Sequence, residues 1–456
     1  MRLESFAAAH FSESALADFP APAWARALTI LARESGGLDD WSLGGDDGDV
    51  TIAGRSRATG LPVAGHVWLA HGKIAGFQLT RDLRVRPDDA PVWPPHVADL
   101  VDLTAAIDRE LDWQAADDRF SGVVLVAHGD GILLDRAVGW ADAAQGRLNQ
   151  PSDRFALASL GKMFTAVAVA QLVEAGRLSL DEPIARLLPT YPNPELAAQI
   201  TPRELLNHRS GLGELGRGPE VWQDFERGAG PTQMLRHLKT VPQEFPPGTD
   251  YHYSSAGFLV LGALIEAAGG DAYADRIRTH VFGPAGMADA LFPVPGQLPP
   301  RAAEGLSFAP DDPLGRRRRI GNGAAVPIFS SPASGAYATA DDLFHFMRAL
   351  TAGRLISAAT LADFTAGRSP TWDRLGLYAQ GFIERRTPAG RMFGHAGGAG
   401  AAGTNDVVWA SDDGAWTVVV LSNYDAPVAV DLGTAIMDFV LANPSCCGER
   451  PPPSSL

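Results

Sequence analysis

The stretch FALASLGKMFTAVAVAQLVEAGRL, residues 155–178, carries the strongest pattern in this sequence. It is almost entirely apolar, and its pattern predicts a buried helix. Ser159 and Lys162 stand near its start, three positions apart and therefore on the same face of a helix. This spacing brings the serine Oγ within hydrogen-bond reach of the lysine Nζ, so that a neutral lysine can take the serine proton. The two residues are a candidate nucleophile and its base.

Lysine is rare in this sequence. Of 38 basic residues only three are lysines, Lys73, Lys162 and Lys239, so arginine serves wherever a positive charge alone is sufficient. Arginine keeps its proton at working pH, whereas burial can depress the pKa of a lysine and make it a neutral base. A charged lysine among apolar residues is also costly unless it is paired. These facts favour a catalytic Lys162 over a surface lysine beside a serine N-cap.

Two stretches after the predicted helix carry a resemblance to a known family. They are RLSLDEPIARLLP at 177–189 and ITPRELLNHRSGL at 200–212. Together with the Ser-x-x-Lys pair, they resemble the serine β-lactamase-related family of class C β-lactamases, penicillin-binding D,D-peptidases, D-aminopeptidases and esterases. The resemblance covers about residues 99–441. It implies an α/β fold of the β-lactamase/transpeptidase-like type, with a five-stranded antiparallel sheet flanked by helices, a helical lobe, and the active site between them.

The stretch PPGTDYHYSSAG at 246–257 resembles the Tyr-x-Asn element of the same family. The resemblance identifies Tyr253 as the tyrosine, with Tyr251 as a competitor in register, and places Ser255 where asparagine is usual. Because a nearby lysine ammonium favours the ionised phenol, we expect Tyr253 to relay or accept protons below its free pKa. The hydroxyl of Ser255 is too short to reach a substrate amide as a carboxamide does. This departure disfavours peptide or β-lactam recognition.

The stretch GHAGG at 394–398 resembles the third motif of the family in its His-x-Gly form, where β-lactamases usually carry Lys-Thr-Gly. Glycines at Gly397 and Gly398 let a substrate approach the strand closely, and the Gly398 N–H can form an oxyanion hole with the N–H of Ser159. His395 joins the catalytic candidates. It takes the place of a permanent cation and is largely neutral near its reference pKa of ~6.5, which further disfavours substrates with a carboxylate.

The stretch SSPASGAYATADDLFHF at 330–346 resembles the loop and helix that border the family's pocket. Ser334 and Gly335 are predicted to line the pocket, and a helix N-cap role for these two residues is an equal alternative. The remaining histidines show no metal-ligand spacing, and no glycine loop for a nucleotide appears. We therefore expect neither a metal nor any other cofactor.

The order of patterns along the chain predicts four parts. Residues 1–83 form a small α+β domain, with a helix over 21–35 and strands near 50, 64 and 73, and residues 84–98 form a linker rich in proline and charge. Residues 99–443 form the hydrolase domain. It begins with a helix over 97–114 and a hairpin turned at 129–131, and it ends with four strands and a helix, so one sheet is assembled from distant halves of the chain. Residues 444–456 form a disordered tail.

Composition excludes several partners and sites. The 38 basic and 53 acidic residues give a net charge of -15, which repels nucleic acid and anionic lipid. The apolar runs are well short of the ~20 residues that span a bilayer, and the N-terminus lacks a signal-peptide pattern, so we expect a cytoplasmic protein. Two adjacent cysteines, Cys446 and Cys447, exclude a disulfide framework.

Together these patterns predict a serine hydrolase that forms an acyl-enzyme with small carboxylic esters. A D-stereospecific peptidase or D-aminopeptidase, or a weak β-lactamase, is the alternative within the same chemistry. A binding or scaffold module without activity is the alternative of another class. The expected partner is a small ester or amide substrate.

Overall fold

The computed structural model describes residues 3–13, 16, 38–45, 49–56, 62–70, 73–81, 91–216, 218–308, 319–321, 331–371, 376–399 and 403–444. The chain divides into two compact units. One unit comprises Met1–Pro91 with Phe308–Arg319, and the other comprises Val92–Ser307 with Ile320–Leu456. The helix expected over 21–35, most of the expected linker and the expected tail from 445 onward lie outside the described residues.

The smaller unit contains one short helix and an antiparallel meander. The helix is α1 (Leu3–His10), and the strands pair in chain order as β1 (Leu38–Gly45), β2 (Asp49–Ser56), β3 (Pro62–Ala70) and β4 (Lys73–Arg81). The last three strands contain the segments that the sequence pattern indicates. The first strand was not expected, because LDDWSLGG lacks a regular alternation of apolar and polar residues.

The larger unit is built on one eight-stranded sheet in the order β13-β14-β15-β16-β17-β18-β5-β6. All neighbouring strands in it are antiparallel. Their bounds are β5 (Gly122–His128), β6 (Gly131–Val138), β13 (Ser369–Pro370), β14 (Leu377–Tyr378), β15 (Ile383–Thr387), β16 (Gly390–Ala399), β17 (Thr404–Ser411) and β18 (Trp416–Ser422). The resemblance implies five strands, whereas the hairpin and the four later strands of the sequence pattern make six. The two-residue strands β14 and β13 extend the sheet further, beyond β15.

The early hairpin β5–β6 pairs with the last strand of the sheet. Residues of β5 from Gly122 to His128 face residues of β18 from Ser422 to Trp416. This register confirms that distant halves of the chain assemble one sheet, because the paired positions lie 288 to 300 residues apart in the sequence.

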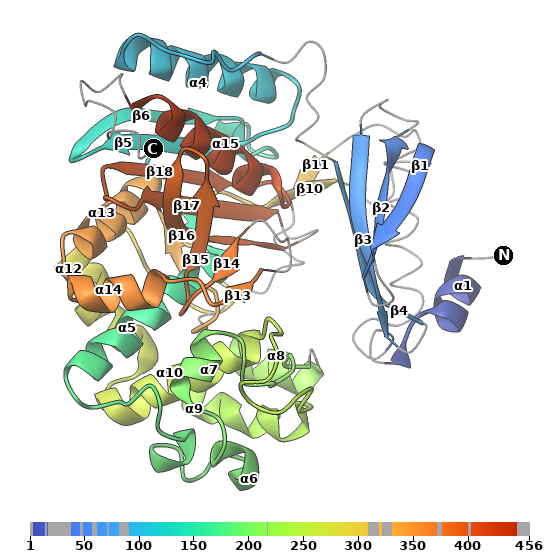
Figure 1. Ribbon diagram of the computed structural model, residues 1–456, viewed down its shortest axis with the longest axis vertical. Coiled ribbons are helices and arrows are strands. Elements are labelled where there is room, and N and C mark those ends of the chain that lie inside the picture. The colour runs from blue at the N-terminus through green and yellow to red at the C-terminus, as the bar shows by residue number, and fades with distance from the viewer. Residues whose placement is uncertain are drawn as a thin grey trace, which may run out of the picture. The chain divides into compact units, whose positions relative to one another are not determined.

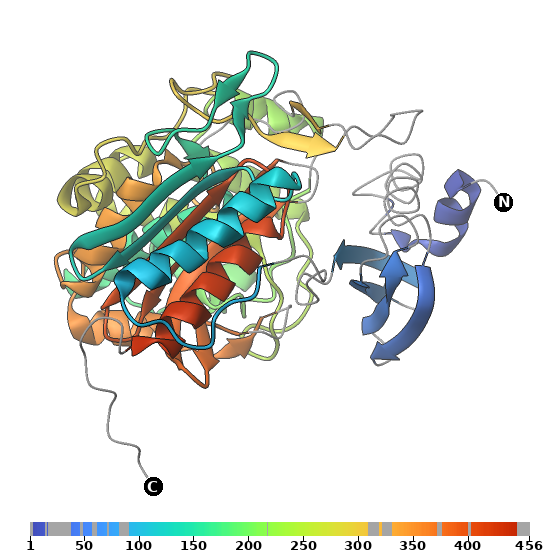
Figure 2. The same ribbon diagram turned by 90° about the horizontal axis from the view of Figure 1, so that it is seen from above.

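The two faces of the sheet bury two separate cores. Side chains alternate along β5, so that Val123 and Leu125 pack into one core while Val124 and Val126 pack into the other. Helices α4 (Leu100–Ala116) and α15 (Val428–Ala442) cover the second face (Figures 1 and 2). Helix α5 (Lys162–Glu174) lies in the first core, where ten of its thirteen residues are buried.

A helical lobe gathers at one end of the sheet (Figure 1). Its elements are η2 (Ile184–Arg186), α6 (Pro194–Ala197), α7 (Pro202–Leu206), α8 (Pro219–Glu226), α9 (Pro231–Met234), η3 (Leu235–Thr240) and α10 (Ser255–Gly269). The other short elements of this unit include η1 (Ala158–Gly161), α11 (Tyr273–Ile277), η4 (Arg278–Phe282), α12 (Gly283–Ala285), α13 (Ala340–Thr351), α14 (Ala358–Thr365), β7 (Trp140–Asp142), β8 (Arg147–Leu148), β9 (Phe155–Ala156) and β12 (Tyr337–Ala338). Strands β10 (Leu306–Phe308) and β11 (Arg319–Gly321) complete the described elements.

No single helix in the described ranges is long and apolar enough to cross a bilayer. Among the described helices, only α10 taken together with Tyr273–Ala285 reaches the required length and hydropathy, and the two pieces are bent by 76°.

Candidate active site

Ser159 and Lys162 lie at the junction between η1 and α5. Ser159 is in the 3₁₀ turn, its side chain is partly exposed, and Lys162 is the first residue of α5. The lysine Nζ donates a hydrogen bond of 3.0 Å to the serine Oγ. Ala158, directly before the serine, has φ +39°, a strained value for a residue with a side chain. The expected juxtaposition of serine and lysine is therefore present, although a 3₁₀ turn rather than an α-helix carries the serine.

Lys162 is fully buried, with 0% of its surface exposed. Its Nζ also donates a hydrogen bond of 3.0 Å to the carbonyl of Ala333 and lies 4.8 Å from the ring centroid of Tyr253. Burial lowers the pKa of Lys162 to about 7, and the carboxylate of Glu214 opposes this shift. The amine is therefore about half neutral at neutral pH, which a proton acceptor beside a serine requires.

Tyr253 is the tyrosine whose hydroxyl bonds Ser159, which resolves the register in its favour over Tyr251. Burial of the phenol raises its pKa, the hydrogen bond to Ser159 lowers it, and the carboxylate of Glu214 raises it further. The expectation that Lys162 lowers the pKa of Tyr253 is therefore wrong. Desolvation of a buried phenolate outweighs the attraction of a lysine that is itself only partly charged. A protonated Tyr253 can pass a proton but does not serve as a standing base.

Three hydrogen bonds fix Tyr253 by joining the loop at 208–214 to the start of α10. The Ser254 N–H donates to His208 Nδ1 at 3.0 Å, the Ser254 hydroxyl donates to the Gly213 carbonyl at 3.0 Å, and the Ser255 N–H donates to Glu214 Oε1 at 2.7 Å. The His208 ring also packs on the Tyr253 ring at 4.2 Å between centroids. Sequence reasoning gave His208 and Glu214 no role.

Ser255 is the first residue of α10, and its side chain is partly exposed. Its backbone therefore meets Glu214 at the position where the family element has asparagine. A carboxylate, rather than a carboxamide, stands beside this part of the site.

Both ring nitrogens of the buried His395 are engaged. Its Nε2 is 2.9 Å from the hydroxyl of Tyr378, and its Nδ1 is 2.6 Å from the carbonyl of Ala396. The carbonyl can only accept, so Nδ1 carries the proton and the Tyr378 hydroxyl donates to Nε2. Burial, with a smaller contribution from Lys162, lowers the pKa of His395 to about 3, so the expectation of a reference pKa is wrong. The ring is neutral, and neither nitrogen is left to exchange a proton with a substrate.

Gly397 and Gly398 permit β16 to pass close to the serine turn. A Cβ atom at Gly397 would overlap the carbonyl of Leu157 and lie 3.2 Å from the N–H of Ser159. Gly398 has φ +154°, and a Cβ there would lie 2.6 Å from Nδ2 of Asn405. Asn405 holds this strand, since its Nδ2 donates to the Gly397 carbonyl at 2.8 Å and its Oδ1 accepts from the Ala429 N–H at 2.7 Å. Sequence reasoning did not identify Asn405.

The segment with Ser334 and Gly335 borders α5. The Ser334 backbone pairs with that of Ser331 in a tight turn, and a Cβ on Gly161 would lie 3.8 Å from the Ser334 Cα. The alternative of an N-cap in this pair is wrong, because Thr339 caps α13 through its side chain. The turn positions the Ala333 carbonyl on Lys162.

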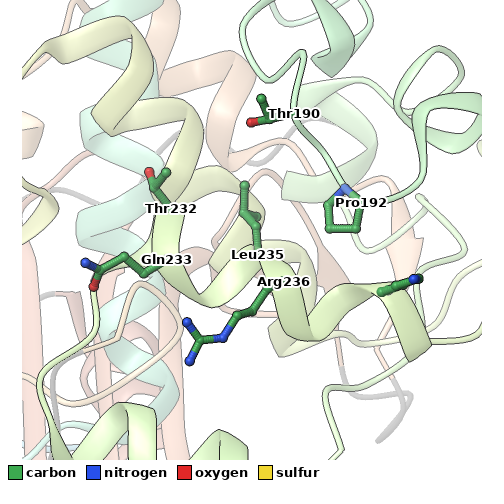
Figure 3. Close-up of a pocket in the computed structure, with 7 residues that line it drawn as sticks. Thr190, Pro192, Thr232, Gln233, Leu235 and Arg236 are labelled. Atoms are coloured by element: carbon green, nitrogen blue, oxygen red, sulfur yellow. The ribbon is translucent and has the colours of Figure 1, made fainter.

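A hollow with a volume of about 370 Å³ lies on the helical lobe (Figure 3). Its one arginine, Arg236, is paired with Asp224, and the hollow shares no lining residue with the serine site. Its lining is Thr190, Pro192, Thr232, Gln233, Leu235, Arg236 and Lys239. This set offers no nucleophile and base pair. Within the described residues, no group of three or more His, Cys, Asp or Glu is placed to hold a metal ion.

Comparisons with known proteins agree with this geometry. The family model named Beta-lactamase matches residues 103–441. The chain belongs to the β-lactamase family. It is 33% identical over 300 residues to esterase EstB of Burkholderia gladioli, covering 58% of this chain and 74% of that esterase. It is 36% identical to penicillin-binding protein 4* of Bacillus subtilis over 172 residues, 37% of each chain.

Solved structures of this β-lactamase family share the fold. A penicillin-binding protein from Bacillus halodurans superposes with a TM-score of 0.63 and 26% identity, covering 72% of this chain and 98% of that one. The fold is thus the β-lactamase/transpeptidase-like α/β fold, and the protein is a serine hydrolase of this family, for which small ester and amide substrates are typical.

Proposed function

We propose that this β-lactamase-family protein is a carboxylesterase that forms an acyl-enzyme on Ser159. The observation that carries the proposal is the fully buried Lys162, with a pKa of about 7, at 3.0 Å from the partly exposed Ser159 Oγ. A neutral amine in this position takes the serine proton as the Oγ attacks the ester carbonyl.

The remaining steps use the neighbouring groups. The N–H groups of Ser159 and Gly398 stabilise the oxyanion of the tetrahedral intermediate. The C–O bond to the alcohol then breaks, and the alcohol leaves with the proton that Lys162 holds, passed through the hydroxyl of Tyr253. Water repeats the sequence on the acyl-enzyme: Lys162 takes its proton, and collapse of the second intermediate frees the acid and returns a proton to Ser159. His395 and Tyr378 position the strand and exchange no proton.

Two features support esters over β-lactams as substrates. His395 is neutral and fully engaged, so it does not hold a substrate carboxylate as a lysine would. Ser255 offers no carboxamide, and the carboxylate of Glu214 lies on its backbone N–H. The similarity to esterase EstB, which extends over 74% of that protein, points the same way.

The test compares substrate classes on one preparation. We expect hydrolysis of p-nitrophenyl butyrate with a kcat/KM at least ~10²-fold above that for a chromogenic cephalosporin, equivalent to ~2.7 kcal/mol of transition-state stabilisation. D-Alanine p-nitroanilide serves as the probe for the D-aminopeptidase alternative. The double variant Ser255→Asn with His395→Lys should narrow the gap between ester and cephalosporin. Equal rates on cephalosporin and ester, or faster turnover of the anilide, would refute the esterase proposal.

A further inference from the structure

Glu214 is a carboxylate at the edge of the reaction centre with no role in the steps above. Its side chain is exposed, yet its Oε1 is fixed at 2.7 Å from the N–H of Ser255, two residues after Tyr253. In the part of the chain that the structure describes, no Lys, Arg or His pairs with it within 4.0 Å. The backbone N–H therefore holds the carboxylate in place, with no counter-ion among the described residues.

Glu214 helps to raise the pKa of His252 through space, but no charged group among the described residues forms an ion pair with it. His252 is bound to Glu244, with 2.9 Å between Nδ1 and Oε2. His395 and His208 are buried, and burial lowers the pKa of each below the usual range of histidine. Glu214 shifts the pKa of both Lys162 and Tyr253, so its field reaches the reacting groups.

We propose that Glu214 selects substrates that carry a cationic group, an ammonium or trimethylammonium, near the scissile carbonyl. The proposal rests on the esterase function and adds a charge preference to it. A cationic group of a substrate within a few ångströms of an exposed carboxylate gains a modest amount of binding free energy, whereas a substrate carboxylate is repelled there. The neutral His395 and the negative Glu214 thus select in the same direction.

The test uses pairs of esters in which a quaternary nitrogen replaces a quaternary carbon. Butyrylcholine and 3,3-dimethylbutyl butyrate place the difference in the alcohol, and methyl (trimethylammonio)acetate and methyl 3,3-dimethylbutanoate place it in the acyl part. The readout is the ratio of kcat/KM for the cationic and the neutral ester. A change in the pKa of Lys162 affects the hydrolysis of both esters in a pair equally, so it cancels in this ratio. The intrinsic reactivity of each ester is the same whichever protein variant is tested.

The variant Glu214→Gln removes the charge and keeps an oxygen that accepts from the Ser255 N–H. We expect the ratio to fall about fivefold in at least one pair, as for a single exposed ion pair. Added salt should lower the ratio in the native protein and leave it unchanged in Glu214→Gln. The control Glu195→Gln removes an exposed carboxylate from α6 and should leave both ratios as they are.

Unchanged ratios for both pairs in Glu214→Gln would overturn the proposal. That outcome differs from failure of the esterase function, in which the folded native protein hydrolyses none of the four esters.

Discussion

The candidate site has two walls that are built in different ways. The serine turn, residues 157–162, brings nucleophile and base together by local spacing alone. The aromatic wall is built from four separate segments of the chain, which contribute His208, Tyr253, Tyr378 and His395. Its neighbouring rings contact one another, with centroids 4.2 to 5.9 Å apart in the pairs that include His208 or Tyr378. The nucleophile and its base are therefore encoded by local sequence, whereas the aromatic side chains around them are brought together by tertiary packing.

The two walls should therefore respond differently to substitution. Changes in the serine turn remove the reacting groups and should abolish turnover. Tyr253 aside, changes in the aromatic wall move those groups by small amounts and should reduce turnover without abolishing it.

The largest effect is expected for Lys162→Met, which keeps the length and removes the amine. Turnover of p-nitrophenyl butyrate should fall at least ~10³-fold, because no neutral amine remains to accept the serine proton. The melting temperature should rise. The folded pKa of Lys162, about 7, lies below its unfolded value, so burial of the lysine disfavours the native state at every pH below that unfolded value.

Lys239→Met is the matched control, since Lys239 belongs to η3 on the helical lobe. Its activity should equal that of the native protein. A Lys162→Met variant that is active, or one that is inactive and less stable than the native protein, would contradict the role given to the buried amine.

A smaller loss of turnover is expected for a substitution at Gly397, where β16 passes beside the serine turn. Gly397→Ala places a methyl group against the Leu157 carbonyl and 3.2 Å from the Ser159 N–H, which displaces β16 from the serine turn. We expect kcat to fall about 10²-fold with a smaller change in KM, the size seen when an oxyanion donor is lost. Gly131→Ala, at a strand glycine with only an ordinary contact at 3.5 Å, is the control. A kcat equal to that of the native protein in Gly397→Ala would show that the close contact between β16 and the serine turn does not matter for catalysis.

The smallest effect is expected for Tyr378→Phe in the aromatic wall. The change removes the hydrogen bond to His395 Nε2 and leaves that nitrogen without a donor, at a cost of about 1 kcal/mol in the free energy of unfolding. We expect kcat to fall about threefold to tenfold, with the pH profile still set by Lys162. A loss as large as that of Lys162→Met would mean that Tyr378 and His395 take part in proton transfer.

Sequence reasoning identified the serine turn because its information is local. The i, i+3 spacing of Ser159 and Lys162 and the apolar run after them predict both the juxtaposition and the burial. The same local periodicity predicted α4, the β5–β6 hairpin, the later strands of the sheet and α15.

Most of the aromatic wall could not be read from spacing. Only the fold shows that His208 packs on Tyr253 or that Tyr378 bonds His395, because 45 and 17 positions separate these partners in the chain. The direction of the Tyr253 pKa shift also needed the structure, since desolvation and the carboxylate of Glu214 both raise that pKa. A glutamate a few residues after the NHRSG segment was visible in the sequence, but nothing in its spacing indicated that it contacts Ser255.

The most direct test of the account is the rate at which a fluorophosphonate labels the protein as a function of pH, with the labelled peptide identified by mass spectrometry. We expect one adduct, on Ser159. The labelling rate should rise with pH through an apparent pKa near 7, because deprotonation of Lys162 creates the base. Ser159→Ala should take no label. A native protein that hydrolyses p-nitrophenyl butyrate but carries its adduct on another residue, or labels at the same rate from pH 5 to pH 9, would contradict the central claim.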